Sequence, residues 1–256
     1  MTLEGIESLN GDETQRESAM RGPDMLGRRN RALQAVPPLD WPRFLGRLQR
    51  SALVVGRPLK MGPPTARRVY FPESGAVSVV VEDPNHQGIE INLVGREGTV
   101  GALMTLSGQH SFIIRPQVQI PGTALWMEAE TLHQEFQRGG AFALWLLRYF
   151  GYMSVHMGQC SLCNRLHSTE ERLARWLLTL SDRLDSSQFH LTHEGIGQMV
   201  GTPRSGVTLV LGTFQRAGYL TVSRGSIHLL NRAGLEATAC DCYQVLRRGF
   251  VSLWEE

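Results

Sequence analysis

Arg204 stands among small polar residues in a setting that suits recognition of an acceptor-rich partner. The segment reads GTPRSGVT, so Thr202, Pro203, Ser205 and Thr208 lie close to Arg204. A guanidinium group is planar and donates two parallel hydrogen bonds, which matches guanine O6 and N7 or phosphate oxygens. The hydroxyl groups of Ser205 and Thr208 can reach a base or a phosphate. We interpret the segment as a candidate base-reading surface.

Two predicted helices must hold this surface in place. Thr192 can cap a first helix that ends at Gly201, and Pro203 suits the first turn of a second helix that stops at Gly218. Two short helices joined by a glycine turn form a helix-turn-helix unit, whose second helix enters the major groove. The alternative is a pair of amphipathic helices in an ordinary core. Apolar residues at helical spacing would form the shared core of the pair: Ile196, Met199, Val200, Val207, Val210, Leu211 and Phe214.

A two-stranded hairpin, or wing, is predicted after the second helix. YLTVS and SIHLL flank the dipeptide Arg224–Gly225, which is typical of a tight hairpin turn. Arg224 at the tip can approach a nucleic-acid backbone. The predicted DNA-contacting residues are Thr192, Thr202, Pro203, Arg204, Ser205, Thr208 and Arg224.

Four cysteines occur as two closely spaced pairs, Cys160/Cys163 and Cys240/Cys242. A C-x-x-C spacing is found in metal and iron–sulfur sites. The first pair, however, lies on a predicted apolar helix, where small buried cysteines are common. A metal- or redox-sensing regulator that uses the four cysteines is therefore an alternative, and we predict no cofactor.

Short β-type runs separated by Gly, Pro, Asn or Asp extend from Ser51 to about Met127: SALVV, RRVYF, AVSVVV, IEINLV, SFIIRPQVQI and TALWM. This pattern predicts a jelly-roll-like double sheet, and the gaps are too short for the crossover helices of a parallel sheet. The predicted class is α+β. A small-molecule-binding β-roll enzyme is the alternative from another functional class, but it would need a cluster of titratable residues that this region lacks.

A long apolar helix is predicted over residues 141–166. We expect the helix to pack on the sheet and on a second copy of the chain, because it is hydrophobic on nearly all sides. Ser168 and Glu171 form a capping box, so the break at Leu166–His167 is a candidate hinge. Residues of the 141–166 helix at steps of three and four form a seam, which is the predicted dimer interface: Phe142, Leu146, Tyr149, Met153, His156 and Cys160, with Cys163 continuing the seam.

The composition of the chain excludes several classes of protein. The net charge of +2 gives no global basic field, and four cysteines in 256 residues are too few for a disulfide scaffold. No apolar run is long enough to span a bilayer, and the N-terminus does not resemble a secretory signal, so we expect a cytoplasmic protein. The predicted organisation is a disordered leader (1–28), a β-roll sensor domain (29–139), a dimerisation helix and hinge (140–166), a winged helix-turn-helix domain (167–245) and a C-terminal tail (246–256).

Three separate segments resemble the Crp/Fnr family of bacterial regulators. Thr192, Gly201, Arg204, Val207 and Gly218 match the motif of its DNA-binding domain. RRVYFPESGAVSVVV with LVGREGTVGA resembles its β-roll sensor, and CNRLHSTEERLARWLL resembles its hinge and following helix. The resemblance covers roughly residues 30–245. It implies a homodimeric transcription regulator, not an enzyme, that binds double-stranded DNA at a pseudo-palindrome, contacts RNA polymerase if it activates, and has no membrane partner.

The sensor departs from the cyclic-nucleotide members of that family. Those members carry a Gly-Glu pair for the ribose and an Arg followed by Ser or Thr for the phosphate. Here Gly101 is followed by Ala102, and the arginine place holds Phe112 or, with a gap, His110, which precedes Ser111. A phosphate buried without a cation is costly, so a cyclic nucleotide is not expected. Gly101, Ala102, His110 and Ser111 stay as candidates for the pocket of an unknown effector.

Two further departures concern the operator and the cysteines. Leu209 stands where cyclic AMP-type members place a second base-reading arginine, so the operator should differ from theirs. Iron–sulfur members carry an N-terminal cysteine cluster, and no cysteine precedes Cys160 here.

Overall fold

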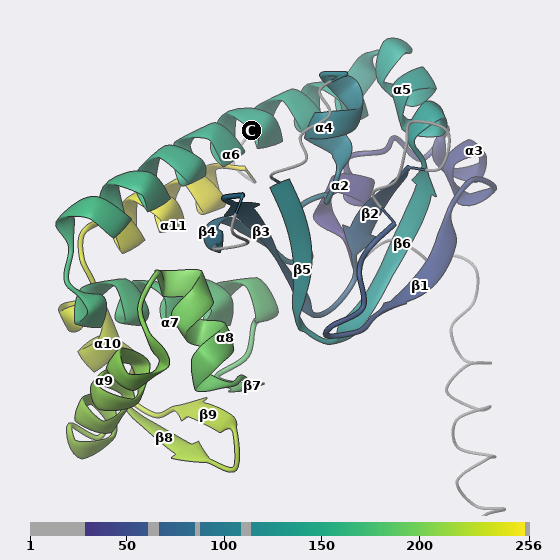
Figure 1. The fold of residues 1–256 in the computed structure, drawn as a ribbon. Helices are drawn as coiled ribbons and strands as arrows, with labels where there is room; N and C mark the ends of the chain where they lie inside the picture. The colour runs from purple at the N-terminus through teal and green to yellow at the C-terminus, as the bar shows by residue number, and fades with distance from the viewer. Residues whose placement is uncertain (1–28, 61–66, 85–87, 109–113, 254–256) are drawn as a thin grey trace, which may run out of the picture.

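The computed structural model describes residues 29–60, 67–84, 88–108 and 114–253. They form a β-rich N-terminal domain, a long helix and a mixed C-terminal domain (Figure 1). The predicted α+β class is confirmed. The predicted leader and two pocket candidates, His110 and Ser111, lie outside the described residues.

Two three-stranded antiparallel sheets form the N-terminal domain. One sheet has the order β1–β6–β2 and the other β4–β3–β5. Apolar residues from both sheets, Leu53, Val77, Val94 and Trp126 among them, form the core between the sheets. The six predicted β runs are therefore confirmed where the structure describes them. The strands are β1 (Gln49–Leu53), β2 (Arg68–Pro72), β3 (Ala76–Glu82), β4 (Gly88–Val94), β5 (Ile114–Ile120) and β6 (Gly122–Glu128).

Short helices flank these sheets. Asp40 precedes one of them, and its carboxylate accepts a hydrogen bond of 2.9 Å from Arg43 Nη1 and does not cap a backbone N–H. The helices at residues 102–106 and 129–137 were not predicted from the sequence. The first of them starts after Gly101, whose φ is 93°. Glycine adopts that left-handed conformation without strain. The helices are α2 (Arg31–Gln34), α3 (Trp41–Leu45), α4 (Ala102–Leu106) and α5 (Ala129–Gln137).

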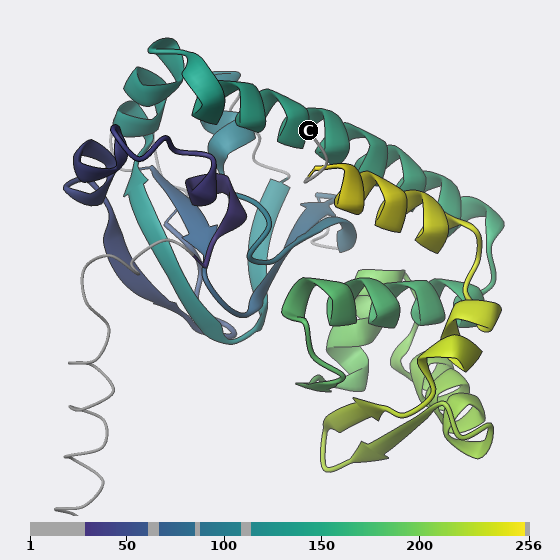
Figure 2. The ribbon, with the colours of Figure 1, turned by 180° about the vertical axis from the view of Figure 1, so that it is seen from behind.

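Helix α6 (Gly140–Leu166) confirms the long helix but not the predicted partner of its seam. All seven seam residues are buried within the chain itself, where α6 packs on β4, α2 and α11 (Cys242–Ser252). The expectation that the seam faces a second copy was therefore wrong. A different stripe is open to solvent, and in Figures 1 and 2 the rest of the molecule lies on the other side of α6. We name this stripe the outer α6 face; it comprises Leu144, Leu147, Gly151, Val155, Gly158 and Leu162.

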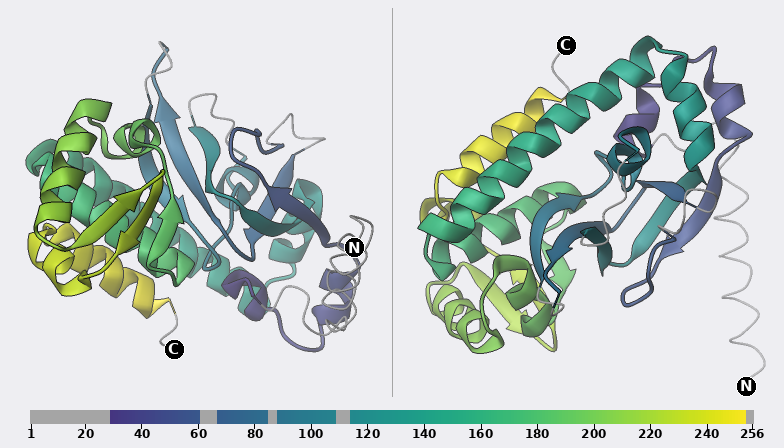
Figure 3. Two further views of the ribbon diagram at one scale, coloured as in Figure 1. Left: turned by 90° about the horizontal axis from the view of Figure 1, so that it is seen from below. Right: turned by 45° about the horizontal axis from the view of Figure 1, so that its top comes forward.

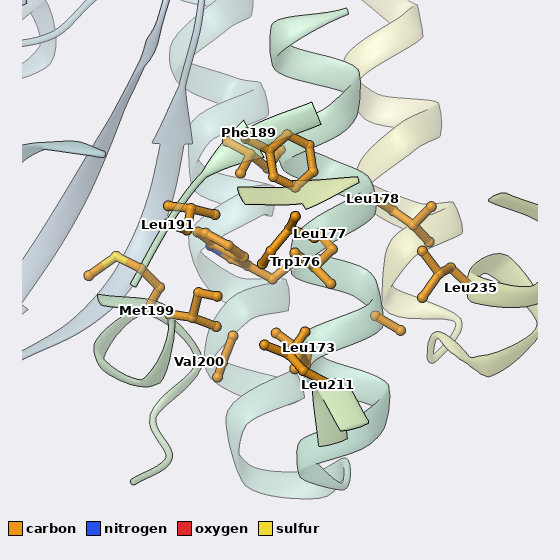
Figure 4. Close-up of a cluster of buried hydrophobic side chains, with 14 of the residues drawn as sticks. Leu173, Trp176, Leu177, Leu178, Phe189, Leu191, Met199, Val200, Leu211 and Leu235 are labelled. Atoms are coloured by element: carbon orange, nitrogen blue, oxygen red, sulfur yellow. The ribbon is translucent and has the colours of Figure 1, made fainter. Parts of the chain in front are cut away.

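The C-terminal domain is built around α7 (Thr169–Leu184), whose predicted capping box is present at Ser168 and Glu171. Trp176 is fully buried at the centre of a cluster from α7, α8, α9 and the hairpin (Figure 4). The predicted shared core is confirmed, with Val210 only partly buried. The remaining elements are β7 (Gln188–His190), α8 (His193–Val200), α9 (Arg204–Arg216), β8 (Leu220–Ser223), β9 (Ser226–Leu229) and α10 (Arg232–Thr238).

The segment predicted as a C-terminal tail is largely helical. Helix α11 continues to Ser252 and buries Tyr243, Leu246 and Leu253. It lies along α6, as the right-hand view of Figure 3 shows. The helical spacing of these apolar residues could have predicted this helix. Across the described residues, α6 included, none of the helices is both apolar and long enough to cross a membrane.

Candidate nucleic-acid interface

The turn between α8 and α9 is fixed by one cap and two glycines. Thr192 Oγ1 accepts a hydrogen bond of 3.0 Å from the Gly195 N–H, as predicted. Gly201 ends α8 with a φ of 63°, in the left-handed region that favours glycine. A Cβ on Gly197 would stand 2.5 Å from the Thr202 carbonyl oxygen, so only glycine allows this close approach. Pro203 occupies the N-cap of α9, one residue before the predicted position.

The start of α9 presents a polar, solvent-exposed surface. Arg204, Ser205 and Thr208 are all exposed, and no other described residue holds the Arg204 guanidinium by a hydrogen bond or ion pair. The Thr208 hydroxyl donates to the Arg204 carbonyl at 3.0 Å and lies 2.8 Å from His193 Nδ1. Sequence reasoning missed His193, although its place directly after the cap of α8 put it next to the second helix.

Thr202 and Leu209 border this surface. Thr202 is half-buried. A Cβ on residue 206 would stand 2.9 Å from the Thr202 hydroxyl oxygen, which explains why residue 206 is a glycine. Leu209 is 69% exposed, whereas Leu211, the other leucine of α9, is buried. An exposed leucine can make an apolar contact with a base edge, such as a thymine methyl group.

The other two predicted DNA-contacting residues lie in a cleft. Thr192 and Arg224 line an open space of about 940 Å³ between the hairpin and β5, which Arg115 lines from the other side. Arg204, Ser205 and Thr208 do not line this cleft. The hairpin turn at Arg224 and Gly225 has φ values of 48° and 78°, as a two-residue turn of this type requires.

The family comparison identifies this unit. Residues 171–238 match the model of the Crp-like helix-turn-helix domain. The C-terminal domain is a Crp-like helix-turn-helix domain. Beyond that domain, the described residues share the fold of solved Crp/Fnr-family regulators, in which a β-rich N-terminal domain and a long helix precede the helix-turn-helix domain.

Solved structures show the same fold at low sequence identity. FixK2 from Bradyrhizobium japonicum is 17% identical, with a TM-score of 0.64 over 75% of this chain and 98% of FixK2. A putative crp/fnr-family regulator from Eubacterium rectale is 17% identical, with a TM-score of 0.61 over 82% of this chain and 98% of the other. TTHA1359 from Thermus thermophilus is 21% identical, with a TM-score of 0.58 over 75% and 98%. Sequence comparison with curated proteins finds no match.

A second, smaller cavity lies between the N-terminal domain and α6. The described residues leave about 60 Å³, lined by Gly101 together with Thr99, Met153, Met157 and other largely apolar residues. Ala102 does not line this cavity; it is fully buried in the core cluster that also contains Met153. A site for a small organic ligand typically has roughly 300–1,000 Å³.

Two buried polar contacts attach α7 of the Crp-like domain to the N-terminal domain. Trp176 Nε1 donates to Glu90 on β4 at 2.8 Å, and the Ser78 hydroxyl donates to the second oxygen of Glu90. Arg183 Nε lies 3.3 Å from Glu97, and both side chains are 2% exposed. Such contacts fix orientation because a buried polar group must keep its partner.

We expect the stabilisation by the buried Glu90 contact to depend on pH. Burial raises the pKa of Glu90 to about 7 from its usual 4.5, although Ser78 and Arg175 oppose the shift. The folded state therefore holds a proton that the unfolded state releases, so this stabilisation is complete below pH 4.5 and is lost as the pH rises through 7. The unfolding free energy of Glu90→Gln minus that of the wild type should increase over this interval by up to about 3 kcal/mol. Urea denaturation of both proteins at several pH values measures it, and a difference that does not change with pH contradicts the prediction.

Proposed function

We propose that this protein is a sequence-specific transcription regulator that binds a pseudo-palindromic operator as a homodimer and reads each half-site with the start of α9. The observation that supports this most directly is the exposed Arg204, held by no other described residue, at the first position of the second helix of a Crp-like domain. In helix-turn-helix proteins, residues at that place contact base edges in the major groove.

Each residue of the surface has a proposed role. Arg204 donates two hydrogen bonds to guanine O6 and N7, which is the commonest specific arginine contact with DNA. Ser205 and Thr208 contact a neighbouring base or phosphate, and Leu209 gives an apolar contact to a thymine methyl group. Arg224 on the hairpin contacts the phosphate backbone once the cleft it lines has opened toward DNA.

The outer α6 face is the proposed dimer interface, in place of the buried seam. Leu144, Leu147, Val155 and Leu162 are each roughly half exposed. A Cβ added to Gly151 or Gly158, which lie between them, would meet no described atom within 4 Å. Glycines allow two helices to approach closely, and the leucines give the pair apolar area to bury. A twofold pair would place the two α9 helices at half-sites about one DNA turn apart.

We propose that the predicted sensor domain does not bind a cyclic nucleotide. The apolar cavity of about 60 Å³ offers no cation for a phosphate among its described lining residues. Burying a phosphate without a cation is costly. An effector of different chemistry, or none, is consistent with this domain.

Arg204→Ala is the direct test of the reading surface. We expect specific binding to weaken by ~1–3 kcal/mol and selectivity to relax at one base pair in each half-site, because the bidentate contact is lost. Titration of the operator recovered by genome-wide mapping of bound DNA measures both effects. Arg248→Ala is the control, since Arg248 is an exposed arginine on α11 in the same chain. Unchanged affinity and selectivity of Arg204→Ala would show that α9 does not read the operator in this way.

A further inference from the structure

Three of the four cysteines meet at one point of the fold, together with a histidine. Cys163 lies near the end of α6, His167 directly follows that helix, and Cys240 and Cys242 flank the start of α11. The three sulfur atoms and a ring nitrogen of His167 all lie within 4.8 Å of one another. Cys160, which shares the C-x-x-C spacing with Cys163, is not part of this group.

We propose that Cys163, His167, Cys240 and Cys242 bind one Zn²⁺ ion. Three cysteines and one histidine form a closed tetrahedral set, which is a ligand set of structural zinc sites. With Zn–S bonds of about 2.3 Å and a Zn–N bond of about 2.0 Å, the ligand atoms of a tetrahedron stand roughly 3.4–3.8 Å apart. The Cys163–Cys240 sulfur distance is 3.5 Å, and Cys242 Sγ lies 3.4 Å from His167 Nδ1.

The local backbone explains why these four side chains converge. Cys163 and His167 are four residues apart at the end of α6, so they project from the same face. Cys240 follows the last turn of α10, and Cys242 opens α11, which returns along α6. Figures 1 and 2 show the end of α6 and the α10–α11 connection at the same edge of the molecule.

The surroundings of the group suit a zinc–thiolate centre. Gln159 Nε2 donates to Cys242 Sγ at 3.0 Å, and donors of this kind stabilise and orient a ligand sulfur. Three thiolates around Zn²⁺ leave one excess negative charge in a buried place. Arg175 is 2% exposed, interacts electrostatically with Cys163, and has Nη1 3.9 Å from Cys160 Sγ, so a buried cation is already at hand.

The ion would act as a clamp on the DNA-binding domain. All four ligands lie outside the matched residues 171–238, two before the domain and two after it. The metal would therefore tie both ends of that domain to the end of α6. It would fix the hinge at His167, and with it the orientation of α9 relative to the outer α6 face.

Metal content and Co²⁺ spectroscopy of the full chain test the site. Protein purified under reducing conditions should contain about one zinc per chain, and Cys160→Ser should contain the same amount as the matched control. Cys163→Ser and Cys240→Ser should contain at least fivefold less. After zinc removal, added Co²⁺ should give the absorption of a tetrahedral thiolate complex in the wild type, and this spectrum should be lost or shifted in His167→Ala. His167 is only partly buried, so that variant keeps the core intact even if the cysteine variants fail to fold.

Three results would overturn the proposal. One is a wild-type protein that holds no zinc and gives no tetrahedral Co²⁺ spectrum. Another is a Cys163–Cys240 disulfide, found by mass spectrometry after anaerobic purification, which would make the group a thiol pair. The third is equal zinc content in the wild type, Cys163→Ser, Cys240→Ser and His167→Ala, which would place the metal elsewhere. None of these results bears on DNA binding by Arg204, so the two proposals can fail separately.

Discussion

Replacing Arg183 with methionine is expected to lower the free energy of unfolding by about 3–5 kcal/mol, the usual cost of removing one partner of a buried ion pair. The Arg183 guanidinium lies against Glu97 of the N-terminal domain, donates to the Tyr152 hydroxyl on α6, and stands 4.0 Å from the ring centroid of Phe250 on α11. Methionine fills similar volume but leaves the Glu97 carboxylate buried, with the Gly95 N–H as its remaining hydrogen-bond donor among the described residues. Urea denaturation measures the change.

A matched control separates this buried contact from a surface ion pair. Arg96 pairs with Asp185 at 3.1 Å, but the side chains are 42% and 78% exposed. Arg96→Met should therefore cost less than about 1 kcal/mol. The double variant Glu97→Gln/Arg183→Met should recover part of the lost stability, because it removes the uncompensated charge. Equal small losses for Arg183→Met and Arg96→Met would contradict the role given to Arg183.

The contrast between these two arginines illustrates what sequence alone could predict. The strands and the α8–α9 pair were predictable because their signals are local: alternation bounded by turns, the Thr192 cap, and Gly201. The partners of Arg183 were not predictable, since Glu97, Tyr152 and Phe250 come from three distant segments. Contacts of this kind depend on how the two domains dock, which no local pattern records.

The long helix shows a second limit. Helix α6 carries Leu146 and Tyr149 on its buried side and Leu147 and Val155 on its outer side. Both stripes recur at steps of three and four, so periodicity predicted a seam but not which seam packs on the chain itself. The proposed group of metal ligands could not be predicted from the sequence either, because Cys163 and Cys240 are 77 residues apart and no sequence pattern marks His167 as a ligand.

Val155→Glu is expected to convert a dimer into a monomer and to weaken binding to the full operator by about 10²–10⁴-fold. Val155 lies near the middle of the outer α6 face and is 53% exposed in the single chain. In a twofold helix pair the two introduced carboxylates would approach each other while losing water, and both effects oppose association. The large loss follows from linkage: in a dimer the second half-site is bound at a high effective concentration, an advantage a monomer lacks.

The prediction for the outer α6 face has a matched control and two outcomes that would contradict it. Leu39→Glu adds the same charge at a leucine that is 96% exposed and far from α6 in sequence, so dimerisation and operator binding should not change. Sedimentation velocity gives the oligomeric state, and titration of full and half operators gives the affinities. Val155→Glu should bind an isolated half-site as the wild type does, because α9 is untouched. A wild-type protein that is monomeric on its operator, or a Val155→Glu protein that still dimerises, would show that the two copies meet through another surface.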